Sequence, residues 1–345
     1  MASYNSKNRT SNYLQINNIK GYIEYDVDIN IAGIILNQVS SEALYQYLKK
    51  PIEDTFKIPC LGYLPHDKAI ILKSRHLGLV PTDELKSIDS QIDVVARLVE
   101  KCINLDKLLD IAKEEITSYD QLATDYKAKD AECKNQKYKD VYIGIAKDKA
   151  FSFYYEDNLK YMESLGVNLV PFSPMHDKVL PRGLDGLYIG GGFPEIFAKE
   201  LEQNYRFRND LKKQLEEGLP AYAECGGLIY LCKTYKDING NETDMAGFFN
   251  NKVVMTNRLQ RFGYVEIETK SGLITLGHEF HHTKLENAEI GGYYNVTKLS
   301  KQSKKWKCGL QDRNVLAAYP HIHFYSNLEF VSELLSVCLN RKQNK

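Results

Sequence analysis

A cysteine followed by two glycines is the feature of this sequence that most directly indicates chemistry. Cys225 lies in the run Ala223-Glu-Cys-Gly-Gly227, between a predicted buried strand at 220–223 and a predicted helix that starts near Leu228. Small residues on both sides permit the sharp turn that exposes a nucleophile at the carboxyl end of a sheet. The N-terminus of the following helix favours a thiolate. We therefore predict that Cys225 is a nucleophile, although an isolated cysteine is more often a buried structural residue.

A glycine-rich run precedes this turn in the sequence. Gly190-Gly-Gly-Phe-Pro-Glu195 follows a predicted strand at 186–190 and leads into a predicted helix at 195–217. Consecutive glycines allow backbone N–H groups to approach a ligand closely, and such groups can form an oxyanion hole for acyl transfer. A turn selected only for its shape would need the same residues. The run is therefore informative mainly in combination with Cys225.

Two histidines near the C-terminus could supply the base that a cysteine nucleophile needs. His321 and His323 lie in the segment Ala318-Tyr-Pro-His-Ile-His-Phe324. In an extended segment they point to opposite faces, so we expect only one of them to face Cys225. Either histidine taken alone would more often be a hydrogen-bonded structural residue, and the spacing leaves the choice between them open.

The segment His278-Glu-Phe-His-His282 matches the zinc-binding pattern HExxH. On a helix this spacing places both histidines on one face, with Glu279 as a base. The preceding residues 273–277 are β-like and lie between glycines, and an extended segment would keep the two imidazoles apart. We therefore reject a zinc protease and predict no metal site.

Strands and helices that could position these side chains alternate along the second half of the chain. This alternation predicts an α/β fold in which helices cover a mostly parallel sheet. The predicted strands are at 141–146, 167–171, 186–190 and 220–223, and the predicted helices are at 155–165, which Gly166 ends, and at 195–217. Residues 248–294 have a β-like pattern.

The first half has a shorter pattern of the same kind. We predict strands at 31–36 and 58–65, a helix at 41–56 with Ser41 as its N-cap, and an amphipathic helix at 88–111. A polar, lysine-rich stretch follows. We therefore predict a first domain at 1–112, a linker at 113–139 and a second domain at 140–345.

Composition excludes several classes of protein. The chain has 345 residues, which suits two domains, and its 45 basic and 45 acidic residues give no net charge. This balance argues against a nucleic-acid-binding protein and against general attraction to membranes. No apolar run approaches the roughly 20 residues of a membrane helix, and the polar first residues lack the core of a secretory signal. Seven scattered cysteines indicate reduced thiols, so we expect a cytoplasmic protein.

Taken together, the motifs resemble those of the cobyrinate a,c-diamide synthase family, glutamine-dependent amidotransferases of cobalamin synthesis. They follow the order of the family from about residue 31 to the end of the chain. The matching stretches are Ile31-Ala-Gly-Ile-Ile-Leu-Asn37, Leu61-Gly-Tyr-Leu-Pro65, Ser74-Arg-His-Leu-Gly-Leu-Val-Pro81, Ala150-Phe-Ser-Phe-Tyr-Tyr-Glu-Asp-Asn-Leu159, Leu187-Tyr-Ile-Gly-Gly-Gly-Phe-Pro-Glu195, Ala223-Glu-Cys-Gly-Gly-Leu228, Gly277-His-Glu-Phe-His281 and Ala318-Tyr-Pro-His-Ile-His-Phe-Tyr-Ser-Asn327.

The resemblance implies a class I glutaminase domain from about residue 140 onward. Cys225 would form a glutamyl thioester and release ammonia, and His321 occupies the place of the catalytic histidine. The segment for the oxyanion hole and glutamine binding would contain Gly191, Gly192 and Gly226. Many related glutaminases have a glutamate two residues after the histidine, but that position is His323 here. The third member of the catalytic group stays open.

For the first domain, the resemblance implies a dethiobiotin-synthetase-like ATPase. It would use ATP and Mg²⁺ to convert the a and c carboxylates into acyl phosphates, with Asn37 near the adenine. The P-loop pattern GxxxxGK[ST] that should open such a domain does not occur in this sequence. We therefore expect a chain that lacks the P-loop portion, as a fragment, a split protein or a misassigned start, and its use of ATP is doubtful.

The function that the resemblance implies is glutamine- and ATP-dependent amidation of cobyrinate. Related tetrapyrroles, hydrogenobyrinate and nickel sirohydrochlorin, are alternative substrates. A different class of function is a truncated, non-catalytic chain that binds a partner or a tetrapyrrole. The incomplete first domain would leave a sheet edge exposed, which favours association and allows a homo-oligomer.

Overall fold

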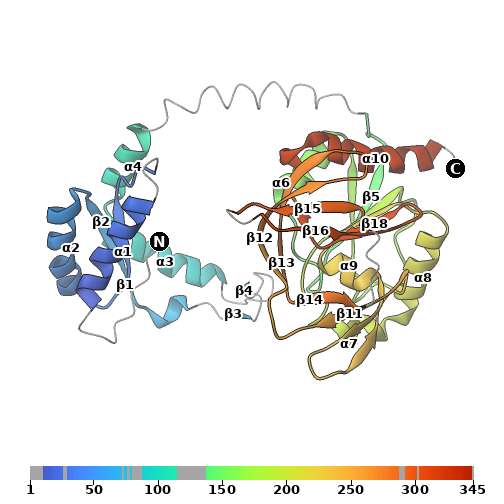
Figure 1. Cartoon of the computed structure of the whole chain (residues 1–345), viewed down its shortest axis with the longest axis horizontal. Coiled ribbons are helices and arrows are strands. Elements are labelled where there is room, and N and C mark those ends of the chain that lie inside the picture. Colours follow the sequence, from blue (N-terminus) through green and yellow to red (C-terminus); the bar gives the residue numbers. More distant parts are fainter. Residues whose placement is uncertain are drawn as a thin grey trace. The chain divides into compact units, whose positions relative to one another are not determined.

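The computed structural model describes residues 11–25, 29–71, 74–75, 78–79, 88–114, 137–286, 292–300 and 303–343. Contacts divide the chain into two compact units, Met1–Ala128 and Lys129–Lys345 (Figure 1). The division falls inside the predicted linker at 113–139. Residues 115–136 of that linker lie outside the described residues, as does part of the 74–81 motif, so the predicted domain boundaries stay predictions.

A parallel β–α–β unit forms the centre of the first unit. β1 (Ile34–Val39) pairs in parallel with β2 (Cys60–Pro65), and α2 (Glu42–Phe56) connects them. The predicted N-cap is confirmed, because Ser41 Oγ accepts a hydrogen bond from the Leu44 N–H at 3.2 Å. The other elements of this unit are α1 (Ser11–Tyr25), η1 (Lys68–Ile70), β3 (Ser74–Arg75), β4 (Gly78–Leu79), α3 (Ile88–Cys102) and α4 (Leu105–Glu114).

The prediction of one continuous helix at 88–111 is wrong, because the chain breaks between α3 and α4. Ile103 forms an isolated β-bridge with Gly62, and the Asn104 N–H donates to the Leu61 carbonyl at 2.7 Å. Asn104 Oδ1 then accepts from the Lys107 N–H at 3.0 Å and begins the second helix. Backbone groups of residues 103 and 104 therefore pair with the edge of β2, whereas in a continuous helix they would form hydrogen bonds within the helix. Helix α1 was not predicted, because its apolar residues have only weak periodicity.

The second unit is built around a six-stranded sheet. Its strands are β5 (Tyr142–Ala146), β6 (Asn168–Phe172), β7 (Gly186–Ile189), β8 (Ala221–Glu224), β17 (Leu310–Asp312) and β18 (Val315–Ala318). They lie in the order β17-β18-β8-β7-β5-β6, all parallel except β17. Every residue of β7 and β8 is buried, as expected for parallel strands covered on both faces. The predicted α/β class is confirmed for this unit.

Two smaller sheets extend the second unit, and the predicted β character of 248–294 is confirmed. One sheet contains β9 (Cys232–Lys236), β10 (Glu242–Asp244), β11 (Phe249–Met255) and β14 (Thr283–Glu286). The other contains β12 (Arg261–Glu268), β13 (Ile274–His281), β15 (Tyr294–Lys298), β16 (Lys305–Cys308) and β19 (His321–Ile322). One hydrophobic core includes residues from all three sheets. Because β19 pairs with β13, the second sheet holds His321, one of the two candidate histidines.

The helices of the second unit differ from prediction at one point. The predicted helix at 195–217 is two helices, because the buried Asn204 interrupts it. Its side-chain Nδ2 donates to the carbonyls of Pro174 at 2.9 Å and Asp177 at 2.7 Å, which fixes the break. The helices are α6 (Glu156–Ser164), α7 (Ala198–Gln203), α8 (Tyr205–Glu216), α9 (Gly226–Leu231), η4 (Phe324–Ser326) and α10 (Leu328–Gln343). Among the described residues, none of the helices has the length and apolarity needed to cross a membrane.

Candidate active site

Cys225 lies on a strained turn between β8 and α9. Its φ of 45° and ψ of −94° are values that a residue with a side chain rarely adopts. The neighbouring glycines are needed for space: a Cβ on Gly226 would lie 3.0 Å from the Gly192 nitrogen, and one on Gly227 would lie 2.2 Å from the Ile189 oxygen. The chain therefore has the predicted sharp turn between strand and helix, and the role of Cys225 as a nucleophile stays a prediction. Only 8% of Cys225 is exposed.

His321 is the histidine that faces Cys225. It is buried in β19, with 5% exposure, and its imidazole interacts with both the Cys225 sulfur and the Glu224 carboxylate. Burial acts to lower the His321 pKa, but the negative charges of Cys225 and Glu224 outweigh it and raise that pKa to about 10. The arrangement therefore favours an imidazolium beside the sulfur.

His323 lies away from the cysteine. Its side chain is 37% exposed, and its Nε2 is 3.9 Å from Asp157 Oδ2. Its ring contacts Tyr155, with the ring centroids 5.0 Å apart. The structure thus brings His321 and Cys225 together and leaves His323 at the surface, a choice that the spacing in the sequence left open.

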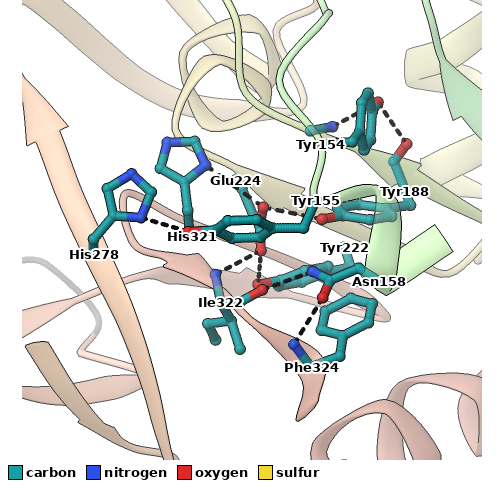
Figure 2. Close-up of polar contacts among 11 residues, drawn as sticks. Tyr154, Tyr155, Asn158, Tyr188, Tyr222, Glu224, His278, His321, Ile322 and Phe324 are labelled. Carbon is teal, nitrogen blue, oxygen red and sulfur yellow. Dashed lines mark hydrogen bonds and ion pairs between the residues drawn. The ribbon is translucent and has the colours of Figure 1, made fainter. Parts of the chain in front are cut away.

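Glu224 is a site residue that the sequence analysis did not identify. It directly precedes the nucleophile, and only 1% of it is exposed. Its carboxylate accepts hydrogen bonds from the hydroxyls of Tyr188 at 3.0 Å and Tyr222 at 2.6 Å, and from the Ile322 N–H at 3.1 Å (Figure 2). The sequence contains one signal that could have identified it, because an acidic side chain ends an otherwise apolar, fully buried strand.

The three predicted glycines have different places in the site. The Gly191 N–H donates to the Phe153 carbonyl at 3.1 Å, so that donor is already used. A Cβ on Gly191 would lie 2.3 Å from His321 Cε1. The imidazole therefore occupies the space that a side chain at position 191 would need. Gly192 has a φ of +153° and lies against Gly226. Gly192 and Gly226 therefore lie close together at the turn that carries Cys225.

Replacing Gly191 by alanine is expected to lower the glutamine hydrolysis that the family resemblance implies on the order of 100-fold, because the new methyl group would displace the His321 ring by a substantial part of an ångström. The rate of glutamate release from the purified variant measures this effect. Gly21→Ala is a matched control, since nothing lies within 4 Å of a Cβ at that position. Unchanged hydrolysis by the Gly191 variant would show that His321 tolerates movement or takes no part.

The HExxH segment forms part of the site wall and has the predicted strand conformation. It lies in β13 and the residue after it, where histidines four residues apart are separated by about 13 Å. His278 Nδ1 is hydrogen-bonded to the Tyr155 hydroxyl at 2.8 Å, and its ring stacks on His321 with centroids 4.9 Å apart. Burial, followed by the charge of His321, lowers the pKa of His278 to about 4. His278 therefore lines the site as a neutral ring.

Side chains alternate between the two faces of the sheet along β13, so Glu279 lies on the opposite face from His278. Glu279 is buried, and its Oε1 accepts from the Trp306 indole N–H at 3.3 Å. Within the described ranges no group of three or more His, Cys, Asp and Glu side chains is arranged to hold a metal ion.

Several other cysteines are poorly suited to nucleophilic chemistry. Burial raises the pKa of Cys60 to about 11 and those of Cys308 and Cys338 to about 12, and it raises the pKa of Cys232 further still. These thiols stay protonated near neutral pH. Cys225 differs from them in its backbone strain and in its contact with His321.

Asn37 lies in the first unit, at a cavity of about 640 Å³. Its Oδ1 accepts a hydrogen bond from the Gln38 N–H at 2.9 Å. The described lining of this cavity is mainly aliphatic and aromatic, from α1, β1 and α4, and includes no lysine or arginine. Such a lining does not fit a triphosphate with Mg²⁺, which needs positive charge and backbone donors. We derive no step through ATP from these residues.

A match to a known protein family covers most of the second unit. Residues 142–328 match the model of the CobB/CobQ-like glutamine amidotransferase domain, so this unit is a class I glutamine amidotransferase domain. A crystal structure of a glutamine amidotransferase aligns with 57% of this chain and 98% of its own length, at 18% identity and a TM-score of 0.43.

Curated relatives extend the similarity to nearly the whole chain. A cobyrinate a,c-diamide synthase from Caldanaerobacter subterraneus subsp. tengcongensis is 42% identical over 93% of this chain and 70% of its own length. The protein of the same name from Clostridium acetobutylicum is 42% identical over 92% of this chain and 70% of its own length. The chain belongs to the cobyrinate a,c-diamide synthase family.

Proposed function

We propose that this chain hydrolyses glutamine at Cys225. The observation that carries the proposal is the contact between Cys225, whose backbone is strained, and the buried His321, whose pKa is raised. His321 accepts the thiol proton, and the sulfur attacks the side-chain amide carbon of glutamine. The tetrahedral intermediate then collapses as the imidazolium protonates the leaving nitrogen, which releases ammonia and leaves a glutamyl thioester. Water, deprotonated by His321, hydrolyses the thioester to glutamate and restores the thiol.

The negative oxygen of the tetrahedral intermediate needs hydrogen-bond donors. The Gly192 and Gly226 N–H groups are the proposed pair, because these two glycines lie close together at the turn and the Gly191 N–H is already bonded to Phe153. Such donors supply a large part of the rate enhancement in acyl transfer. Gly191 contributes space for the imidazole.

The ammonia is proposed to amidate carboxylates of cobyrinate, at the a and c side chains. This acceptor is suggested by the relatives, which are named cobyrinate a,c-diamide synthases and align with nearly the whole chain. A reaction of this kind forms a carbon–nitrogen bond, as a ligase does. A carboxylate is a poor electrophile until one oxygen becomes a leaving group, so this half-reaction needs an activating nucleotide such as ATP.

A glutamine analogue that alkylates thiols is expected to label Cys225 selectively, since glutamine recognition delivers the electrophile to this sulfur. Peptide mapping by mass spectrometry locates the label, and excess glutamine should protect the site. The Cys225→Ala variant is the control and should stay unlabelled. Labelling mainly at Cys232 or Cys308 would contradict the proposal.

A further inference from the structure

The imidazole of His321 has a single carboxylate beside its Nδ1. Nδ1 lies 3.6 Å from Glu224 Oε2, and among the described residues this nitrogen has no hydrogen-bond partner. Both side chains are almost fully buried, so the contact is shielded from water. Hydrogen bonds between catalytic groups are often long before substrate binds and shorten in the substrate complex.

The carboxylate is held from several sides. Glu224 Oε1 accepts from the Tyr222 hydroxyl and the Ile322 N–H, while Oε2 accepts from the Tyr188 hydroxyl. These donors come from β8, β19 and β7, so three strands hold one carboxylate. Figure 2 shows the carboxylate between the two tyrosines and the strand that carries His321.

The strand that carries His321 is also anchored. Asn158 in α6 donates from Nδ2 to the Ile322 carbonyl at 2.8 Å and accepts at Oδ1 from the Phe324 N–H at 2.8 Å (Figure 2). The backbone from the Ile322 carbonyl to the Phe324 N–H is therefore fixed. A rigid strand and a rigid carboxylate together hold the imidazole in one orientation.

A histidine can accept the proton of a thiol only if its ring has the right orientation and the right tautomer. A carboxylate beside Nδ1 holds a proton there, which leaves Nε2 free to accept the proton of the nucleophile. The position two residues after His321 cannot do this, because His323 is partly exposed and its Nε2 lies near Asp157. The other groups that face the His321 ring are Cys225, Phe153 and His278. Of these, the His278 ring stacks on it and the Phe153 ring meets it edge-on, and neither ring carries a negative charge.

We propose that Glu224 is the positioning residue that orients His321 and fixes its tautomer, and that it completes the catalytic group from the position directly before the nucleophile. The inference rests on the proposed glutaminase function. Its competitor is a purely structural role, in which the carboxylate only ties together the tyrosines of β7 and β8.

The variant Glu224→Gln separates these roles, because it keeps the size of the side chain and removes its charge. Its amide can donate toward Nδ1, which would favour the tautomer with the proton on Nε2. We expect kcat for glutamine hydrolysis to fall about 100-fold, with KM changed less than about threefold. Tyr222→Phe is the matched control: it removes a hydrogen bond from the same carboxylate but leaves the charge beside His321, so its kcat should fall far less. Equal losses in the two variants would overturn the proposal.

A second readout does not need activity. In Cys225→Ala protein, nuclear magnetic resonance of labelled histidine should show neutral His321 with its proton on Nδ1. Adding Glu224→Gln should lower the pH midpoint of His321, because a negative charge that stabilises the imidazolium is lost. A proton on Nε2 in Cys225→Ala protein, or an unchanged midpoint in the double variant, would overturn the proposal. If the wild-type chain hydrolyses no glutamine, the proposed function fails, and this comparison still decides the role of Glu224.

Discussion

Glutamine hydrolysis is expected to be lost when Cys225 is replaced by alanine, with a fall of at least about 10⁴-fold, because no thioester can form without the sulfur. Alanine keeps the small size that the turn requires, so the fold should be retained. Glutamate release measured with a coupled assay gives the rate, and circular dichroism checks the fold.

The matched control for this experiment is Cys102→Ala, which removes a partly exposed thiol from the first unit. Its hydrolysis rate should equal that of the wild type. Substantial hydrolysis by the Cys225 variant would mean that another nucleophile acts, and the mechanism proposed for this site would have to be abandoned.

The second large effect is expected for His321→Ala, which should lower hydrolysis by about 100-fold or more if His321 is the general base. The variant removes both the acceptor of the thiol proton and the positive charge beside the sulfur. Steady-state kcat at several pH values measures the loss. His321→Ala should also remove the pH dependence that titration of this imidazole contributes.

His323→Ala is the natural comparison, because the two histidines are only two residues apart. His323 is partly exposed and lies near Asp157, so its removal should cost much less. A larger loss for His323→Ala than for His321→Ala would show that the base has been assigned to the wrong histidine.

Local features of the sequence were enough to predict the turn at Cys225. A nucleophile turn requires small residues next to it, and the sequence has glycines at 226 and 227, directly after the cysteine. The parallel strands were predictable for a similar reason. A short apolar run such as β7 is suited to burial on both faces, and the adjacent helix signals define the crossover connections.

Helix ends inside the amphipathic patterns could not be predicted in this way. The break at Asn104 depends on the Leu61 carbonyl, and the break at Asn204 depends on the carbonyls of Pro174 and Asp177. These partners are distant in the sequence and leave no local pattern.

Taken alone, the sequence identified Cys225 as the candidate nucleophile and limited the candidate base to His321 or His323, because residue types and the order of strand, turn and helix can be read locally. Only the tertiary structure decided between the histidines: β19 pairs with β13, which buries His321 against Cys225 and leaves His323 partly exposed. It also brought Glu224 beside Nδ1 of His321. A buried carboxylate is stable only where several donors converge on it, and here those donors come from separate strands that meet only in the folded protein.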